Sequence, residues 1–350
     1  MGPVTVGNNA GLHLNGPGAS DESSSGNNSQ GQGGLSGRSA LVQQFELQQN
    51  GKDEESAIFD KLSLLSQGLD DKNKVYREVE NLKKVNSAYI AKYYDWWIGE
   101  KTFYIIMEYC PDTLRKIINL RPGVFTRHYG QTMGDLEYYM TCEIFRQTLE
   151  CVQYMHGLSP PVIHRDLKPE NILISYDSEH DRFVKLCDFG LATVHNKTIN
   201  NQGSNAYTMD VGTVNYQAPE IGKGGKYDHK SDVFSLAIIG AELFELEREE
   251  LENPPRPGNG QDESQTQNTI MKIGDKGKKR PECSEVLAKY DDWSINKNII
   301  GKDVKIIGLI NNLKDNDEHR FFYEFFKRCN LMDKYQPKIV PDEPGTSDEE

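Results

Sequence analysis

The sequence predicts an α+β fold with two lobes, a smaller one rich in strands followed by a larger one rich in helices. Residues 89–97 and 102–109 are aromatic and β-branched and are separated by a glycine-containing turn, so we expect two paired strands. Residues 135–156 and 232–246 have the length and apolar content of buried helices. Strands that precede helices along one chain are typical of an α+β architecture.

Weaker patterns predict the remaining elements. Val75, Val79, Leu82 and Val85 are spaced by four, three and three residues, which indicates a helix over 74–85. The other expected elements are a hairpin within 41–65, short strands at 172–175 and 183–187 around a polar turn, and helices near 281–289 and 302–329.

Composition divides the chain into four parts. Residues 1–38 are rich in Gly, Ser and Asn and are expected to be a disordered tail, because they bury too little apolar surface to offset chain entropy. Residues 39–109 form the expected small lobe and residues 110–335 the large lobe. Residues 336–350 are an acidic tail, also expected to be disordered. Residues 247–267 are polar and of low complexity, and no element is predicted there.

Charge and cysteine usage limit the class of protein. The formal net charge is −13, which argues against a protein that binds a nucleic-acid backbone. The six cysteines include no C-x-x-C pair, so we expect reduced thiols in a cytoplasmic protein, with a nuclear location as the alternative. No apolar run approaches the roughly 18 residues that span a bilayer, so no membrane partner is expected. The oligomeric state is not written in the sequence.

Three motifs carry the chemistry. Residues 164–171 read H-R-D-L-K-P-E-N, residues 188–190 read D-F-G, and residues 218–220 read A-P-E. In this order they resemble the catalytic loop and the activation-segment boundaries of eukaryotic protein kinases, Ser/Thr branch. The resemblance covers roughly residues 74–287. It implies the bilobal protein-kinase fold, here with a degenerate, mainly β N-lobe and a larger, mainly α C-lobe.

The resemblance implies roles for four residues of the large lobe. Asp166 would accept the proton of a Ser or Thr hydroxyl on a protein substrate, and Lys168 would meet the transferring phosphate. Asn171 and Asp188 would hold Mg²⁺, which prefers oxygen ligands. The implied cofactors are ATP and Mg²⁺.

The resemblance also implies a nucleotide-binding side. Met107 would gate the adenine pocket, while Glu108 and Cys110 would offer backbone hydrogen bonds to the base. Glu78 falls where the family has a regulatory-helix glutamate. Glu80 competes for that role, but the leucine four residues after Glu78 favours Glu78.

Two nucleotide-binding motifs are degenerate. No V-A-I-K strand is present; Lys61 lies 17 residues before Glu78, a family-like interval, yet a solvated lysine explains it equally well. Residues 31–37 resemble G-x-G-x-x-G with one extra residue, but they lie in a glycine-rich tract where such a pattern arises easily. Two functions therefore stay open: an active kinase, which the complete large-lobe motifs favour, and a pseudokinase that binds or scaffolds. A truncated or misassembled gene product would also explain the small lobe.

Several residues are expected to form the scaffold of the site. By the same resemblance, His164 packs beneath Phe189, Glu220 pairs with Arg280 in a buried ion pair, and Asp232 holds the backbone of the catalytic loop. The phenylalanines at 321, 322, 325 and 326 share one helix face, which favours packing onto the large lobe over binding a partner.

Finer assignments rest on shorter stretches. R-E-V at 77–79, Y-Y-D-W-W at 93–97 and D-F-G-L-A-T at 188–193 resemble the kinases of the alpha subunit of translation initiation factor two. Thr198, Ser204 and Thr208 are the candidate phosphorylation sites between the D-F-G and A-P-E motifs.

Overall fold

The computed structural model describes most of the two expected lobes. It covers residues 62–68, 79–85, 87–98, 102–128, 131–176, 182–194, 214–221, 228–246, 261–275, 279–298, 300, 309, 312–314 and 316–329. The predictions for Lys61, Glu78, the glycine run at 31–37, the two tails, and Thr198, Ser204 and Thr208 lie outside these residues.

The described part of the small lobe contains a three-stranded antiparallel sheet. β2 (Tyr93–Ile98) and β3 (Thr102–Glu108) pair as predicted, although β2 begins later than the expected residue 89. β1 (Leu62–Gly68) pairs with the other edge of β3, which gives the order β1-β3-β2. Of the hairpin expected within 41–65, only residues 62–65 are described; they belong to β1, whose described partner is β3. The sequence of β1, LSLLSQG, contains no lysine.

Short strands form two further sheets. β4 (Asp112–Thr113), β6 (Ile172–Ile174) and β7 (Val184–Leu186) make an antiparallel sheet in the order β4-β6-β7. β5 (Val162–Ile163) pairs with β8 (Thr193–Val194). The strands predicted at 172–175 and 183–187 are confirmed to within one residue at each end. The D-F-G motif follows β7 after one residue, Cys187.

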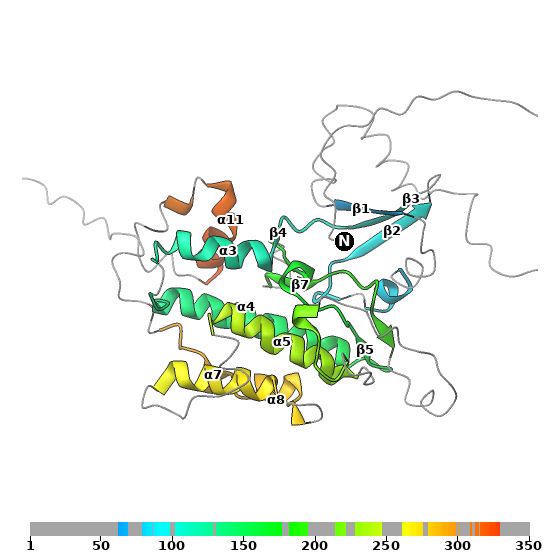
Figure 1. The fold of residues 1–350 in the computed structure, drawn as a ribbon. Helices are drawn as coiled ribbons and strands as arrows, with labels where there is room; N and C mark the ends of the chain where they lie inside the picture. The colour runs from blue at the N-terminus through cyan, green and yellow to red at the C-terminus, as the bar shows by residue number, and fades with distance from the viewer. Residues whose placement is uncertain are drawn as a thin grey trace, which may run out of the picture.

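Helices build the large lobe. α4 (Asp135–His156) has the predicted bounds, and α5 (His229–Leu243) begins three residues before the predicted helix and ends three residues earlier. α3 (Leu114–Val124), α7 (Gln261–Ile273), α8 (Cys283–Leu287) and α9 (Tyr290–Trp293) complete this group. Figure 1 shows α4 and α5 side by side in the middle of the lobe, with the small sheet beside one end of it. Among the described helices, none combines the length and the apolar character needed to cross a bilayer.

Among the described helices, α3, α7 and the short α9 were not predicted. α3 contains Pro122 and Gly123, which hid the buried positions Leu114, Ile117 and Val124. α7 begins within the stretch 247–267, where no element is predicted, so that expectation is wrong for residues 261–267. Its first turns are polar, and only its C-terminal end carries the buried apolar residues Ile270 and Ile273. Packing against α5 and α9, which no local pattern reveals, stabilises α7.

The last described helix, α11 (Arg320–Arg328), packs onto the large lobe as predicted. Its four phenylalanines are all at most 1% exposed. The rings of Phe321 and Phe325 lie 5.6 and 5.5 Å from that of Phe183, and Phe322 meets Phe125 beyond α3 at 6.2 Å. In Figure 1 α11 lies next to α3. These aromatic contacts explain why the four phenylalanines lie on one face of the helix.

Candidate functional site

The loop after β5 brings three of the predicted site residues together. Asp166 lies 8% exposed, and its Oδ2 atom accepts a hydrogen bond from Lys168 Nζ at 2.7 Å. Asn171, in the 3₁₀ turn η3 (Pro169–Asn171), donates from Nδ2 to the Asp166 backbone oxygen at 2.8 Å and to Oδ2 at 3.2 Å. One carboxylate is thus oriented by both a cation and an amide, which is an arrangement suited to holding and deprotonating a hydroxyl.

Asp188 lies two residues after β7, on a segment that is hydrogen-bonded to η3. The Cys187 N–H donates to the backbone oxygen of Asn171 at 3.1 Å, which ties the segment carrying Asp188 to η3. Asp188 has φ of 61°, a left-handed conformation that Asp tolerates better than most residues. Gly190 N–H donates to its Oδ1 atom at 3.4 Å. The side chains of Asn171 and Asp188 therefore project from two neighbouring, hydrogen-bonded segments.

A buried aspartate fixes the backbone of this loop. Asp232, near the start of α5, is 1% exposed and accepts hydrogen bonds from the His164 N–H at 2.8 Å and the Arg165 N–H at 2.9 Å. His156 Nε2 lies 2.9 Å from the same carboxylate. Burial opposes ionisation, but the contacts with His156 and the backbone outweigh it, and the pKa of Asp232 is lowered. The predicted contact between Asp232 and the loop backbone is confirmed.

The histidine of the motif is part of the core. His164 is fully buried, its Nε2 lies 2.9 Å from the Cys187 backbone oxygen, and its ring lies 5.1 Å from that of Phe189. The expected packing of His164 against Phe189 is confirmed. A ring that is buried in this way and hydrogen-bonded to a backbone oxygen is suited to holding the loop in position rather than to transferring a proton.

The helix of which residues 79–84 are described contacts the D-F-G segment. Asn81 donates from Nδ2 to the backbone oxygens of Ala192 at 2.9 Å and Phe189 at 3.4 Å. Glu80 faces solvent, with a side chain 61% exposed that pairs with Lys83. A solvent-facing Glu80 is poorly placed to serve the site, which leaves Glu78 as the better candidate for the helix glutamate.

Glu108 has a role that the sequence did not suggest. Its carboxylate accepts hydrogen bonds from Lys185 Nζ on β7 at 2.6 and 2.7 Å, and from the Ser175 hydroxyl at 3.1 Å. Its own N–H donates to the Lys92 backbone oxygen at 2.7 Å, so this N–H is not available to a base. Met107, 2% exposed on β3, lies opposite Ser63 of β1 and Tyr93 of β2. The side chain of Glu108 thus joins the small sheet to the β4-β6-β7 sheet.

The A-P-E glutamate forms the expected ion pair. Arg280 Nη1 and Nη2 meet the two carboxylate oxygens of Glu220 at 2.5 and 2.9 Å. The Arg280 side chain is fully buried, whereas that of Glu220 is 29% exposed, so the pair is less enclosed than predicted. Burial opposes the charge of Glu220, yet the hydrogen bonds from Arg280 outweigh it and lower its pKa.

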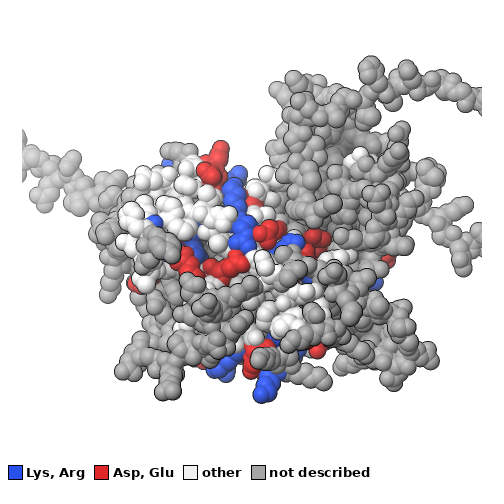
Figure 2. All heavy atoms as spheres, in the orientation of Figure 1, with Lys and Arg blue, Asp and Glu red and all other residues white. Residues whose placement is uncertain are grey.

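Charged side chains of both signs lie close together on the surface. Figure 2 shows basic and acidic atoms next to one another on the described part of the face that it draws. One such group was missed from the sequence: Arg115 of α3 contacts Glu170 of η3 at 2.7 Å. The only sequence signal for it is a basic residue in the first turn of a helix that was itself not predicted.

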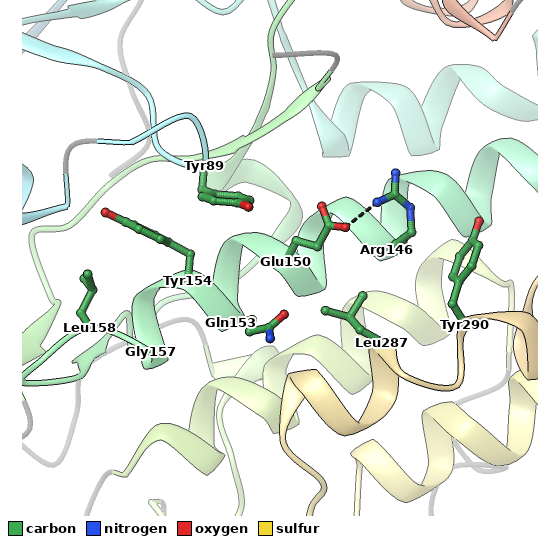
Figure 3. Close-up of a pocket in the computed structure, with 9 residues that line it drawn as sticks. All are labelled: Tyr89, Arg146, Glu150, Gln153, Tyr154, Gly157, Leu158, Leu287 and Tyr290. Atoms are coloured by element: carbon green, nitrogen blue, oxygen red, sulfur yellow. Dashed lines mark hydrogen bonds and ion pairs between the residues drawn. The ribbon is translucent and has the colours of Figure 1, made fainter.

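A groove of about 710 Å³ lies elsewhere, along α4. Figure 3 shows Tyr89 and Tyr154 stacked at one end of it, and Arg146 paired with Glu150 at the other. None of its nine lining residues belongs to the catalytic-loop, D-F-G or A-P-E motifs. The groove is therefore separate from the site that the motifs form.

Comparison with known proteins agrees with the geometry. Residues 37–320 match the family model described as the protein kinase domain. The chain is 32% identical over 216 residues to a mitogen-activated protein kinase kinase kinase 7-like protein of Drosophila melanogaster, which covers 60% of this chain and 46% of that protein. It is 34% identical over 182 residues to the serine/threonine-protein kinase nekl-2 of Caenorhabditis elegans (51% and 46%), and 30% identical over 169 residues to an Aurora kinase of Saccharomyces cerevisiae (48% and 40%). The matched region thus spans less than half of each of these relatives, and their names come from different kinase groups.

Proposed function

Because this chain belongs to the protein kinase family, Ser/Thr branch, we propose that it transfers the γ-phosphate of ATP to a Ser or Thr hydroxyl of a protein substrate. The observation that supports this most directly is the contact of Asp166 with both Lys168 and Asn171. Phosphoryl transfer depends on positioning and on charge neutralisation more than on covalent chemistry. The loop supplies an oriented carboxylate and a cation within 2.7 Å of each other.

In this proposal each residue has a separate task. Asp166 holds the substrate hydroxyl and accepts its proton as the oxygen attacks. Lys168, whose side chain is 18% exposed, meets the transferring phosphoryl group and neutralises its charge. Asp232 and His164 keep the loop in place and do not touch the substrate. Met107, Glu108 and Cys110 lie on the β3 strand and the segment after it, where the adenine base is proposed to bind.

The proposed magnesium ligands fit the ion by their chemistry. Asn171 turns its Nδ2 toward Asp166, so its Oδ1 lies on the opposite side of the amide. Asp188 supplies a partly exposed carboxylate from the adjoining segment. One or two protein oxygens together with substrate phosphates are a usual environment for Mg²⁺, which would neutralise phosphate charge when bound.

A second function, binding or scaffolding without turnover, is favoured by one observation. β1, one of the two strands that pair with β3, contains no lysine, and Lys61 immediately precedes β1. Without a lysine on the phosphates, a kinase fold still packs and still presents surfaces to partners. Turnover by the wild type, compared with Asp166→Asn, separates this function from the first, and a Lys61→Ala variant tests whether Lys61 binds the phosphates.

The test is a transfer assay with labelled ATP, Mg²⁺ and a generic Ser/Thr substrate. Asp166→Asn should lower the rate by about 10²- to 10⁴-fold, the range for loss of a general base, while its melting temperature stays within a few degrees of the wild type. Lys61→Ala should raise KM for ATP if Lys61 binds the phosphates, and should leave KM unchanged if it is a solvated lysine.

The outcomes are distinct. Turnover that vanishes in Asp166→Asn supports the kinase. Wild-type incorporation no higher than that of Asp166→Asn, measured on protein with a cooperative unfolding transition, would overturn it and favour the binding protein.

A further inference from the structure

Arg115 lies beside the catalytic loop, where its side chain contacts two glutamates and a tyrosine. Its Nε atom donates to Glu170 at 2.7 Å, its Nη1 to Glu242 at 2.7 Å, and its Nη2 to the Tyr216 hydroxyl at 2.5 Å. The Tyr216 hydroxyl in turn donates to the other carboxylate oxygen of Glu242. Three of the five guanidinium N–H groups are therefore directed at three different segments of the large lobe.

Each partner belongs to an element that the proposed reaction needs in place. Glu170 lies in η3, directly before Asn171, whose amide holds Asp166. Tyr216 ends η5 (Val214–Tyr216), just before the A-P-E motif, and its backbone oxygen accepts from Ser235 of α5 at 2.8 Å. Glu242 lies near the end of α5, the same helix that presents Asp232 to the loop.

Local helix energetics do not explain an arginine at this position. Arg115 is the second residue of α3, whose first turn contains no acidic side chain. A cation near a helix N-terminus opposes the helix dipole. Burial also opposes its charge, yet the hydrogen bonds to Glu242 and Glu170 outweigh it and raise the pKa of Arg115. The tertiary contacts, rather than the helix, account for the residue.

We propose that Arg115 is a positioning residue of the catalytic site, which ties the Glu170 turn and the Tyr216 end of the activation segment to Glu242 on α5. The proposal rests on the proposed kinase function for its effect on turnover. Without Arg115, the carboxylates of Glu170 and Glu242 lose their shared cation, and the turn that carries Asn171 loses its link to α3. The Asn171 amide then holds Asp166 less firmly.

The chain contains a matched control arginine. Arg146 on α4 also has a side chain 29% exposed, and it pairs with two glutamates, Glu143 at 2.7 Å and Glu150. It also lies against a tyrosine ring, that of Tyr290, at 5.8 Å. Arg146 lines the groove along α4 in Figure 3, and its partners are outside the catalytic motifs. Arg115→Met and Arg146→Met therefore remove similar ion pairs at different places.

The experiment compares both variants by steady-state kinetics, thermal melting and amide hydrogen exchange. Arg115→Met should lower kcat about tenfold or more, with KM for ATP changed less than twofold. Arg146→Met should leave kcat within twofold, with a similar loss of melting temperature. Exchange at residues 168–174 and 214–221 should quicken at least threefold more in Arg115→Met than in Arg146→Met. Arg115→Lys keeps the charge but offers a single cationic centre, so its kcat should fall between the wild type and Arg115→Met.

Two results would overturn the proposal: equal changes of kcat in the two methionine variants, or equal exchange at 168–174 and 214–221. Wild-type protein without turnover would instead defeat the proposed function. The exchange comparison would then still decide whether Arg115 holds the two segments, because it needs no activity.

Discussion

The catalytic loop and the small sheet differ in how their residues are held. In the catalytic loop, Asn171 donates to Asp166, and the Cys187 N–H, next to Asp188, donates to Asn171. The N–H groups of His164 and Arg165 donate to the buried carboxylate of Asp232 on α5. The small sheet is held chiefly by its backbone pairing and by buried apolar residues of β3. The part of the site proposed for acid–base chemistry and Mg²⁺ is therefore organised by polar tertiary contacts, whereas the part proposed to bind nucleotide depends on strand register.

This difference carries a functional consequence. A one-residue shift of register turns every side chain of a strand to the other face of its sheet. The face to which each β1 residue points therefore depends on how β1 pairs, and β1 contains no lysine that could serve the proposed phosphate contact. Asp166 does not depend on register in this way, because its loop is held at several independent points.

The largest effect is expected when the buried anchor of the loop is removed. Asp232→Ala leaves the N–H groups of His164 and Arg165, and the His156 ring, without their acceptor. Loss of one partner from such a buried, charged cluster costs about 3–5 kcal/mol. We expect the free energy of unfolding, measured with urea, to fall by about that amount, and turnover to fall with it. The β3 amides should keep their exchange protection under native conditions; if they lose it equally, the two regions are not held separately.

An intermediate effect is expected at the junction of the two regions. Lys185→Met removes the cation that meets Glu108, where β3 joins the β4-β6-β7 sheet. Both side chains are at most 12% exposed, but Ser175 and the Lys92 N–H still donate to Glu108, so we expect a loss of about 2–3 kcal/mol. KM for ATP should rise more than kcat falls, because the segment after β3 is the proposed adenine site. A fall in kcat with unchanged KM would contradict this reading of Glu108.

The same contrast explains what the sequence could predict. The H-R-D-L-K-P-E-N motif is local, so Asp166, Lys168 and Asn171 were identified together, and the contacts of Asp232, His164 and Arg280 were expected with them. Glu108 was assigned only its backbone, since nothing near it in sequence points to Lys185, 77 residues away. Arg115 was missed for the same reason: its partners are 55, 101 and 127 residues distant.

The smallest effect is expected at the ion pair between Glu220 and Arg280, which belongs neither to the catalytic loop nor to the small sheet. Glu220→Gln keeps the shape of the side chain but loses the charge that meets Arg280, and we expect a cost of about 1–2 kcal/mol at pH 7, since the carboxylate is partly exposed and screened by water. The pKa of Glu220 is lowered in the folded protein from its ordinary value of 4.5, so its charge stabilises the fold above pH 4.5. That stabilisation is lost as the pH falls through the lowered pKa. The difference in unfolding free energy between the wild type and Glu220→Gln should therefore be full at pH 7 and shrink below pH 4.5. A difference that is constant from pH 7 to pH 3 would show that the geometry of the pair, rather than its charge, stabilises the large lobe.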